Sequence, residues 1–318
     1  MRDGVLKRCM TITACALFVG DAGEDRRLPI GGQAVIEGVL MKGPDRWGLS
    51  VRKPDGAIES ETWGGSSRTK RLPWKLPVLR GVVSMVEMMS VGFKALNRSA
   101  QIAVGEEETI TVKEIVLSTV VALIAVVGLF IALPLWLADV AVQLWGLTAL
   151  GRNVAEGVIR GLVFLGYVAL IGLWGEIRQV FRYHGAEHKT IHAYESGADM
   201  TPESIQRCSR IHPRCGTSFL LIVVLVSIVV FSAVGQGTLL WRIGSRILLL
   251  PVVIGVSYEI IKGASRAGVI GRILMAPAMS FQYLTTREPT LGQIEVALCA
   301  LETALGRPVS PSTERTAE

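Results

Sequence analysis

Histidine is nearly absent from this chain of 318 residues, which contains four, and all four lie between His184 and His212. The five cysteines form no Cys-x-x-Cys pair, which excludes a dithiol redox motif and gives no sign of a disulfide framework. This use of cysteine fits a reducing compartment. No dinucleotide or nucleotide phosphate loop follows Gly31-Gly32, and the sequence contains no DNA- or RNA-binding motif. Nucleic acid is therefore not an expected partner, and the clustered histidines are the strongest functional signal.

The composition is that of a membrane protein. Hydrophobic residues make up 50% of the chain, and the mean hydropathy is +0.45. Both values are too high for an ordinary soluble protein. The formal net charge is +6 and the isoelectric point is near 9.2. In a membrane protein such an excess is typical of cytoplasmic loops that face anionic lipid, so membrane lipids are the expected partners.

We expect a polytopic α-helical membrane protein with about four transmembrane helices. The four expected spans are residues 115–138, 154–175, 215–241 and 246–262. The first and third contain no Asp, Glu, Lys or Arg. The second carries Glu156 and Arg160, whose spacing of four on a helix allows them to pair. The fourth is interrupted by Glu259 and closed by Lys262.

The distribution of basic residues predicts the orientation. The loop 176–216 carries six basic residues: Arg178, Arg182, Lys189, Arg207, Arg210 and Arg214. The connections 139–153 and 235–246 carry one and two, and both ends of the chain are rich in Lys and Arg. The positive-inside rule then places both termini and the histidine-rich loop in the cytoplasm of a multi-pass protein of the bacterial cytoplasmic membrane.

The chain divides into five expected segments. They are a poorly ordered extension 1–30, a small cytoplasmic β unit and linker 31–77, an amphipathic helix 78–112, a four-span membrane domain 113–262, and a cytoplasmic tail 263–318 with interfacial and amphipathic helices. In the β unit, the apolar run from Val35 to Met41 predicts one strand. Two further strands, Trp47–Lys53 and Ala57–Trp63, are expected to flank the turn at Pro54-Asp55-Gly56.

A metal-ligand pattern lies within the histidine cluster. His184-Gly185-Ala186-Glu187-His188 reads His-x-x-Glu-His, the pattern of inverted zinc-dependent hydrolases. Positions four apart lie on one face of a helix, so His184, His188 and His192 are expected to line one face of a helix that continues from the second span. Two imidazoles one turn apart can bind Zn²⁺, and Glu187 is the candidate catalytic base.

The third expected ligand is Glu259, one turn before the cytoplasmic end of the fourth span. It follows His188 by 71 residues, and inverted zincins take a third ligand from a downstream glutamate. Two imidazoles and a carboxylate would leave one position of a divalent metal, most plausibly zinc, open for water. The bound metal would lower the pKa of that water towards about 7, and Glu187 would accept its proton.

Four further side chains are secondary candidates for the same site: His192, Glu195, His212 and Cys215. Glu195 lies near the same helical face and could orient an imidazole or act as a fourth ligand. His212 and Cys215 lie just before the third span. Two alternatives remain open. Cys208, His212 and Cys215 could form a closed structural zinc site with His184 or His188, and His192 could simply face headgroups or solvent.

Four motifs resemble one family. They are Gly31-Gly32-Gln33-Ala34-Val35-Ile36-Glu37-Gly38-Val39-Leu40-Met41-Lys42-Gly43-Pro44, Tyr183-His184-Gly185-Ala186-Glu187-His188-Lys189-Thr190, His212-Pro213-Arg214-Cys215-Gly216-Thr217-Ser218 and Leu284-Thr285-Thr286-Arg287-Glu288-Pro289. Together they resemble the YqhQ-like family of bacterial membrane proteins, over roughly residues 30–305. That family is described as a predicted metal-dependent enzyme of unknown function. The resemblance implies a bacterial multi-pass protein with a metal site, and it assigns no substrate or catalytic residue.

The leading functional hypothesis is a metal-dependent hydrolase at the cytoplasmic membrane face, acting on a peptide bond, a lipid ester or a phosphoester. The first alternative is a metal-stabilised membrane scaffold or assembly factor without enzymatic activity. The second is a metal transporter or sensor with His184, His188 and His192 as its entry site. A transporter should carry more ionisable residues deep in its spans than Glu156, Arg160 and Glu259.

Overall fold

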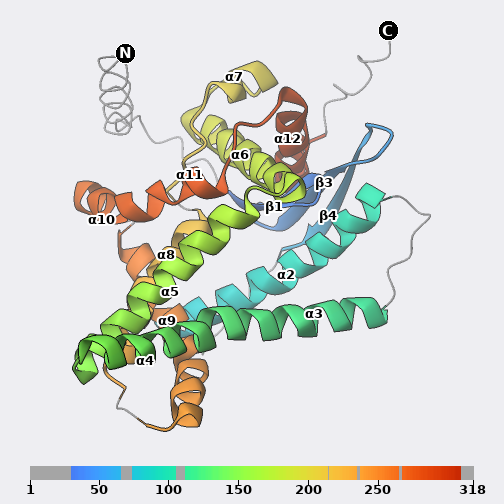
Figure 1. Cartoon of the computed structure of the whole chain (residues 1–318). Helices are drawn as coiled ribbons and strands as arrows, with labels where there is room; N and C mark the ends of the chain where they lie inside the picture. The colour runs from blue at the N-terminus through green and yellow to red at the C-terminus, as the bar shows by residue number, and fades with distance from the viewer. Residues whose placement is uncertain are drawn as a thin grey trace, which may run out of the picture.

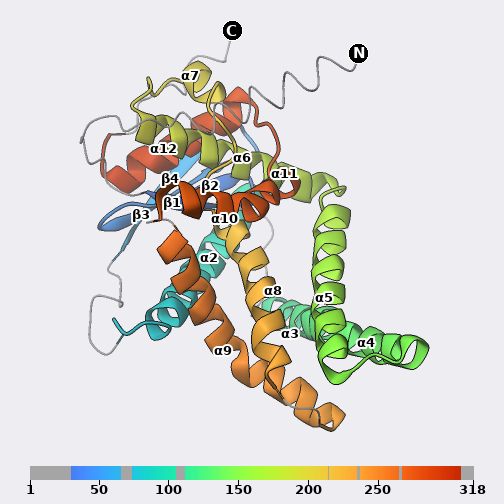
Figure 2. The ribbon, with the colours of Figure 1, turned by 90° about the vertical axis from the view of Figure 1, so that its left-hand side faces the viewer.

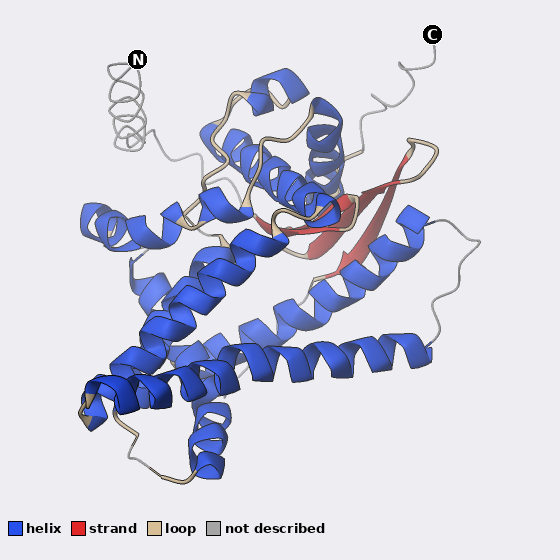
Figure 3. Cartoon of the chain, viewed as in Figure 1, coloured by secondary structure: helices blue, strands red, loops and turns tan. Residues whose placement is uncertain are grey.

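A small antiparallel sheet and a set of long helices make up the computed structural model of the chain (Figures 1 and 3). The structure describes residues 30–65, 74–104, 112–213, 215–234, 237–264 and 267–308. The expected extension 1–30 lies outside the described residues except for Ile30. That residue is 3% exposed and packs in the core.

The sheet has four strands in the order β1-β2-β3-β4, and each neighbouring pair is antiparallel. The strands are β1 (Gly31–Val35), β2 (Gly38–Lys42), β3 (Arg46–Arg52) and β4 (Ile58–Gly64). The turn predicted at Pro54-Asp55-Gly56 is confirmed between β3 and β4. The single strand predicted from Val35 to Met41 is wrong, because Val35 pairs with Gly38 and the chain reverses between them, with Glu37 at a φ of 49°. The buried run is apolar on both sides of this turn, so hydropathy alone does not reveal the reversal.

Helices cover both faces of the sheet (Figure 1). On one face, α2 (Leu79–Val104) buries Ala95 and Ile102 against Leu40 and Leu49. On the other face, α6 (Gly175–Ser196) and α12 (Leu291–Leu305) pack against Val39 and Met41, which alternate with Leu40 along β2. This alternation is the period-two pattern of a strand buried on both sides. The sheet is thus the middle layer of a three-layer unit.

The helix expected over 78–112 spans Leu79–Val104, and residues 105–111 lie outside the described part. Its basic side chains bind protein groups: Arg98 donates to Glu61 at 2.6 Å, and the Lys94 ammonium lies 4.3 Å from the centre of the Trp63 ring. The helix is therefore a layer of the sheet unit. Its outer face exposes large apolar side chains, including Val86, Met89 and Phe93.

Three helical segments are long and apolar enough to cross a membrane: Val116–Trp145, Ala149–Ile171 and Leu240–Ala264. The first is built from α3 (Val112–Val127), a π-helical turn at Gly128–Ala132 and α4 (Leu133–Trp145); it runs crosswise to α5 (Ala149–Ile171) in Figure 2. The third is α9 (Leu239–Ala264). The span predicted over 215–241 is too long, because α8 (Gly216–Ser232) has 17 residues and Leu239 already belongs to α9.

The helix of the second span does not continue through the histidines as predicted. It ends at Ile171, and α6 begins at Gly175 after a short turn over Gly172, Leu173 and Trp174. Figure 2 shows that α6 then runs across the end of α5 and lies on the sheet. The histidines are therefore positioned by the sheet and not by an extension of the span.

The remaining helices connect these layers. They are α7 (Pro202–Gln206), α10 (Gly268–Ser280) and α11 (Gln282–Thr285). Thr201 before Pro202 is a sequence signal for a helix N-cap, and the Thr201 side chain does accept a hydrogen bond from the Ser204 backbone N–H. Thr290-Leu291-Gly292-Gln293 matches a capping box, and this box is formed at the start of α12. The sequence of α12 repeats apolar residues on one face, and this face packs inwards, with Ile294, Ala297 and Leu301 fully buried.

Candidate metal centre

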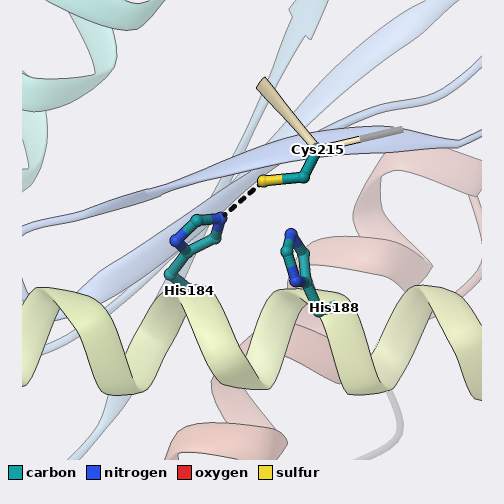
Figure 4. Close-up of side chains that lie close together, drawn as sticks. All are labelled: His184, His188 and Cys215. Atoms are coloured by element: carbon teal, nitrogen blue, oxygen red, sulfur yellow. Dashed lines mark hydrogen bonds between the residues drawn. The ribbon is translucent and has the colours of Figure 1, made fainter. Parts of the chain in front are cut away.

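Two histidines of α6 and one cysteine at the start of α8 converge in the structure (Figure 4). Among the residues that the structure describes, His184, His188 and Cys215 form a group whose ligand atoms all lie within 4.8 Å of one another. The Cys215 sulfur lies 3.3 Å from His184 Nε2, and the two imidazole centres are 4.4 Å apart. The helical spacing of four thus places both rings on the face of α6 that meets the N-terminus of α8.

Backbone carbonyls fix the orientation of both imidazoles. His184 Nδ1 lies 2.9 Å from the Thr285 carbonyl oxygen, and His188 Nδ1 lies 2.6 Å from that of Arg210. A carbonyl oxygen only accepts, so Nδ1 carries the proton in each ring and Nε2 keeps its lone pair. Burial also lowers the pKa of His188 from its ordinary value, which favours the neutral ring. Protein histidines that ligate metals usually make this contact, because it sets the tautomer.

Cys215 is held by the first turn of the next helix. It is the N-cap residue of α8, and its sulfur accepts a hydrogen bond from the Thr217 backbone N–H at 3.4 Å. The Thr217 hydroxyl lies 3.0 Å from the same sulfur and 3.2 Å from the Thr285 hydroxyl. The sequence placed Cys215 among the secondary candidates, and the structure brings it closest to the two histidines.

Glu187 lines the same cavity as these three side chains. The cavity has a volume of about 30 Å³, and Gly32, His212 and Ile191 also border it. The Glu187 side chain is buried, and this burial raises the pKa of its carboxyl group above the ordinary value. A Cβ atom on Gly32 would lie 3.0 Å from Glu187 Oε1 and 2.7 Å from the Leu40 carbonyl oxygen. Strand β1 can therefore pass over the carboxylate only with glycine at position 32.

The other secondary candidates form an outer ring. His212 Nε2 lies 3.2 Å from Glu195 Oε2, and the His212 and His188 ring centres are 5.9 Å apart. Burial lowers the pKa of His212. His192 is half-buried one turn beyond His188 and lies outside the group of converging ligand atoms; burial lowers its pKa as well. Glu195 and His212 are thus paired with each other near the centre.

The structure does not bring Glu259 to the histidines, which corrects the expected ligand set. Its two carboxylate oxygens accept hydrogen bonds from the guanidinium of Arg80 on α2, with Arg80 Nε at 2.6 Å from Glu259 Oε1. The sequence interval to Glu259 matched that of inverted zincins, but its position one turn before the end of α9 orients it towards α2. In the structure, Cys215 and not Glu259 lies beside the two histidines.

One segment that the sequence gave no role supports the centre. Residues 285–289 follow α11 and lie against α6, where the Arg287 backbone N–H donates to the Phe181 carbonyl at 2.8 Å. A Cβ atom on Gly185 would lie 2.1 Å from the Arg287 carbonyl oxygen, so the close approach requires glycine there. Lys189 is buried beside this segment and forms an ion pair with Glu288 at 3.0 Å. The sequence did single out the motif Leu284–Pro289, but it gave no indication that this motif lies beside the histidines.

The donor set fits a transition-metal ion. Two imidazole Nε2 atoms and one thiolate are ligands that zinc takes in proteins, and three protein ligands leave a fourth tetrahedral position open. The outer contacts to the carbonyls of Thr285 and Arg210 supply the orienting shell that such sites require. A carboxylate that borders the same cavity as the ligand side chains, as Glu187 does here, is a feature of hydrolytic sites.

Comparison with known proteins places the chain in a family. A family described as "Protein of unknown function (DUF1385)" matches residues 76–307, which include α2, the histidine helix and α12. A relative described as "Uncharacterized protein YqhQ", from Bacillus subtilis (strain 168), is 33% identical over 285 residues, 84% of this chain and 89% of the relative. No solved structure matches the chain. The chain therefore belongs to the DUF1385 family of YqhQ-like proteins.

Proposed function

We propose that the protein is a metal-dependent hydrolase whose centre is formed by His184, His188 and Cys215, with Glu187 as the general base. The observation that carries this proposal is that the buried Glu187 carboxylate borders the same cavity as all three ligand side chains. Among the residues that the structure describes, the charged groups that act on this buried carboxylate are the histidines themselves, His184 and His212.

The residues have distinct roles in this proposal. His184 and His188 would hold a divalent ion, Zn²⁺ by the chemistry of the donor set, through Nε2, while the carbonyls of Thr285 and Arg210 keep the rings in place. A bound ion would supply Lewis acidity and lower the pKa of water at the site. Glu187 would accept the proton of the attacking water and pass it to the leaving group. Burial of Glu187 under β1 excludes bulk water from this proton transfer.

One observation favours a second candidate, a metal-stabilised scaffold or assembly factor. The cavity of about 30 Å³ is the size of a single water molecule, too small for a substrate group unless β1 or the segment 285–289 moves. The centre also ties α6, α8 and the end of α11 together, which is what a structural metal does. A transporter or sensor has less support, because His184 and His188 lie on the sheet unit and not along the spans.

We also propose where the protein resides. The three membrane-length helices, together with α8 as a short fourth span of about 25 Å at 1.5 Å per residue, cross the bacterial cytoplasmic membrane. The sheet unit, the histidines and both termini lie in the cytoplasm, because the basic residues concentrate on that side of the helices. Membrane lipids are then the direct partners of the exposed apolar side chains of these helices.

Reporter fusions test this topology. A periplasmic reporter is expected to be active when fused at residues 145 and 238, and inactive when fused at residues 200 and 318. Residue 145 is the last residue of α4, and residue 238 directly precedes α9; both lie away from the sheet unit. An active external reporter at residue 200 would place the metal centre on the other face and contradict the cytoplasmic proposal.

The substitution Glu187→Gln tests the hydrolase proposal. Glutamine keeps the size and hydrogen-bonding capacity of the side chain but cannot accept the proton, so the variant should retain metal and abundance while losing at least about 100-fold in activity. In practice, it should fail to complement a deletion strain that has a phenotype. The matched control is Glu176→Gln on the exposed first turn of α6, which should complement fully. Full complementation by Glu187→Gln, together with loss of protein in His188→Ala, would contradict the hydrolase proposal and support the metal-stabilised scaffold.

A further inference from the structure

A second polar site lies at the other end of the long helices, remote from the sheet unit. Asp139 of α4 accepts hydrogen bonds from Arg152 of α5 and Arg242 of α9. All three helices reach the lower part of Figure 1. Arg152 Nε lies 2.8 Å from Asp139 Oδ1, and Arg242 Nη1 lies 2.9 Å from both carboxylate oxygens. The consecutive helices α4 and α5 and the later helix α9 thus contribute one charged side chain each.

These side chains border a cavity of about 550 Å³, within the range of ligand-binding pockets. Its remaining lining comes from Val142, Leu147, Ala149 and Gly237. Ala149 is the first residue of α5, so the positive end of that helix dipole also faces the cavity. The lining therefore combines an apolar wall with guanidinium groups and a helix N-terminus, which together favour an anion.

The guanidinium groups retain unused donors. Within the part of the chain that the structure describes, Arg152 Nη2 and Arg242 Nε are buried and have no hydrogen-bond acceptor. Arg152 Nη2 does lie 2.7 Å from Asp139 Oδ1 as an ion pair, but without hydrogen-bond geometry. Arg152 is only 6% exposed, and Arg242 Nε has neither a hydrogen-bond acceptor nor an ion pair of its own among the described residues. A buried donor without an acceptor is unfavourable, and an acceptor in the cavity would satisfy it.

The charge balance of this end of the molecule is positive. Along α4, α8, residues 149–160 of α5 and residues 239–250 of α9, the acidic residues are Asp139 and Glu156, whereas four residues are basic: Arg152, Arg160, Arg242 and Arg246. Glu156 does not neutralise the arginines of the cavity, because it forms ion pairs with Arg160 and Arg246 at 2.5 and 2.7 Å. A single carboxylate, Asp139, is therefore left for the two arginines of the cavity.

The surrounding aromatic residues place the cavity at headgroup depth. Trp145 and Trp241 are 72% and 56% exposed at the ends of α4 and α9, and Leu144 and Leu240 beside them are also exposed. Tryptophan is enriched where spanning helices meet the membrane interface. We propose that the cavity binds an anionic phosphate group, presented by a phosphodiester lipid headgroup, with Arg152 and Arg242 as its ligands. Only the lipid source of the phosphate depends on the proposed membrane placement.

Lipid binding by the purified full-length protein tests this inference. Native mass spectrometry and thermal unfolding in detergent would be followed on addition of phosphatidylglycerol, phosphatidylcholine or inorganic phosphate. Phosphatidylglycerol should bind and raise the melting temperature, and Arg242→Gln should weaken its binding about tenfold, the loss of one charge-assisted hydrogen bond. The matched control is Arg178→Gln, an exposed arginine of α6 whose loss removes the same charge at the far end.

The variant Asp139→Asn provides an independent test. It removes the carboxylate that competes with the lipid phosphate for Arg152 and Arg242, and it keeps the size of the side chain. It should bind phosphatidylglycerol more tightly than the wild type. Competition by inorganic phosphate would support the phosphate site with a soluble source. Equal binding of phosphatidylcholine and phosphatidylglycerol, an unchanged affinity in Arg242→Gln, or weaker binding in Asp139→Asn would each overturn the proposal. If Arg242→Gln does not fold, the Asp139→Asn result decides.

Discussion

Replacing Glu156 by glutamine is expected to lower the free energy of unfolding by about 3–5 kcal/mol, the usual cost of removing one partner from a buried ion pair. Glu156 is 1% exposed and binds two guanidinium groups, Arg160 one turn along α5 and Arg246 on α9. Both arginines are less than 10% exposed. Glutamine can still form a hydrogen bond, but it leaves two buried positive charges without a counterion, and their repulsion separates α5 from α9.

Thermal unfolding of the purified protein in detergent micelles would measure this effect. The control Glu176→Gln removes an exposed carboxylate from the first turn of α6 and should change stability by no more than about 0.5 kcal/mol. Substitution of Glu156 and both arginines by apolar residues of similar size should restore much of the loss, since a buried ion network is often replaceable as a unit. A melting temperature for Glu156→Gln equal to that of Glu176→Gln would show that the buried triad does not stabilise the helices.

Loss of bound metal is the second large effect expected, and it follows from the geometry of the centre. The purified protein should hold about one zinc ion per chain, and His184→Ala, His188→Ala and Cys215→Ala should each abolish it, because each removes one of three converging ligand atoms. Elemental analysis after dialysis against a weak chelator measures the ratio. Chelator treatment of the wild type should also lower its melting temperature.

The chain supplies close controls for these substitutions. His192→Ala removes the next histidine on α6, and Cys208→Ala removes another partly buried cysteine; both lie outside the group of converging ligand atoms and should retain zinc. Glu259→Gln should likewise retain zinc, because its carboxylate binds Arg80. Zinc retained in His188→Ala, or lost equally in His192→Ala, would contradict the ligand set.

Local sequence patterns predicted the parts of the site that lie on one helix. His184, His188 and Glu187 share α6, so a spacing of four and the motif itself were sufficient to bring them together. Cys215 required a contact between segments 27 residues or more apart in sequence, which local patterns do not encode. Glu259 was predicted from an interval along the chain, but an interval does not determine the direction in which α9 presents its side chain.

In the fold, too, features set by neighbouring residues were predictable and features set by long-range packing were not. The cap at Thr201 and the capping box at Thr290 depend on neighbouring residues, and both were predicted correctly. The reversal at Glu37 and the break between α5 and α6 at Gly172 depend on packing with the sheet, which hydropathy does not encode. The break at Gly172 matters most for the proposed function, because it places the histidines on the sheet unit and not on an extension of α5.

X-ray absorption at the zinc edge of the zinc-loaded, full-length protein tests the central claim most directly, because it reports the atoms bound to the metal. The account predicts one sulfur ligand at about 2.3 Å together with nitrogen ligands at about 2.0–2.1 Å, and loss of the sulfur shell with Cys208 intact when Cys215 is replaced by serine. A wild-type spectrum with nitrogen and oxygen ligands alone would contradict the centre formed by His184, His188 and Cys215.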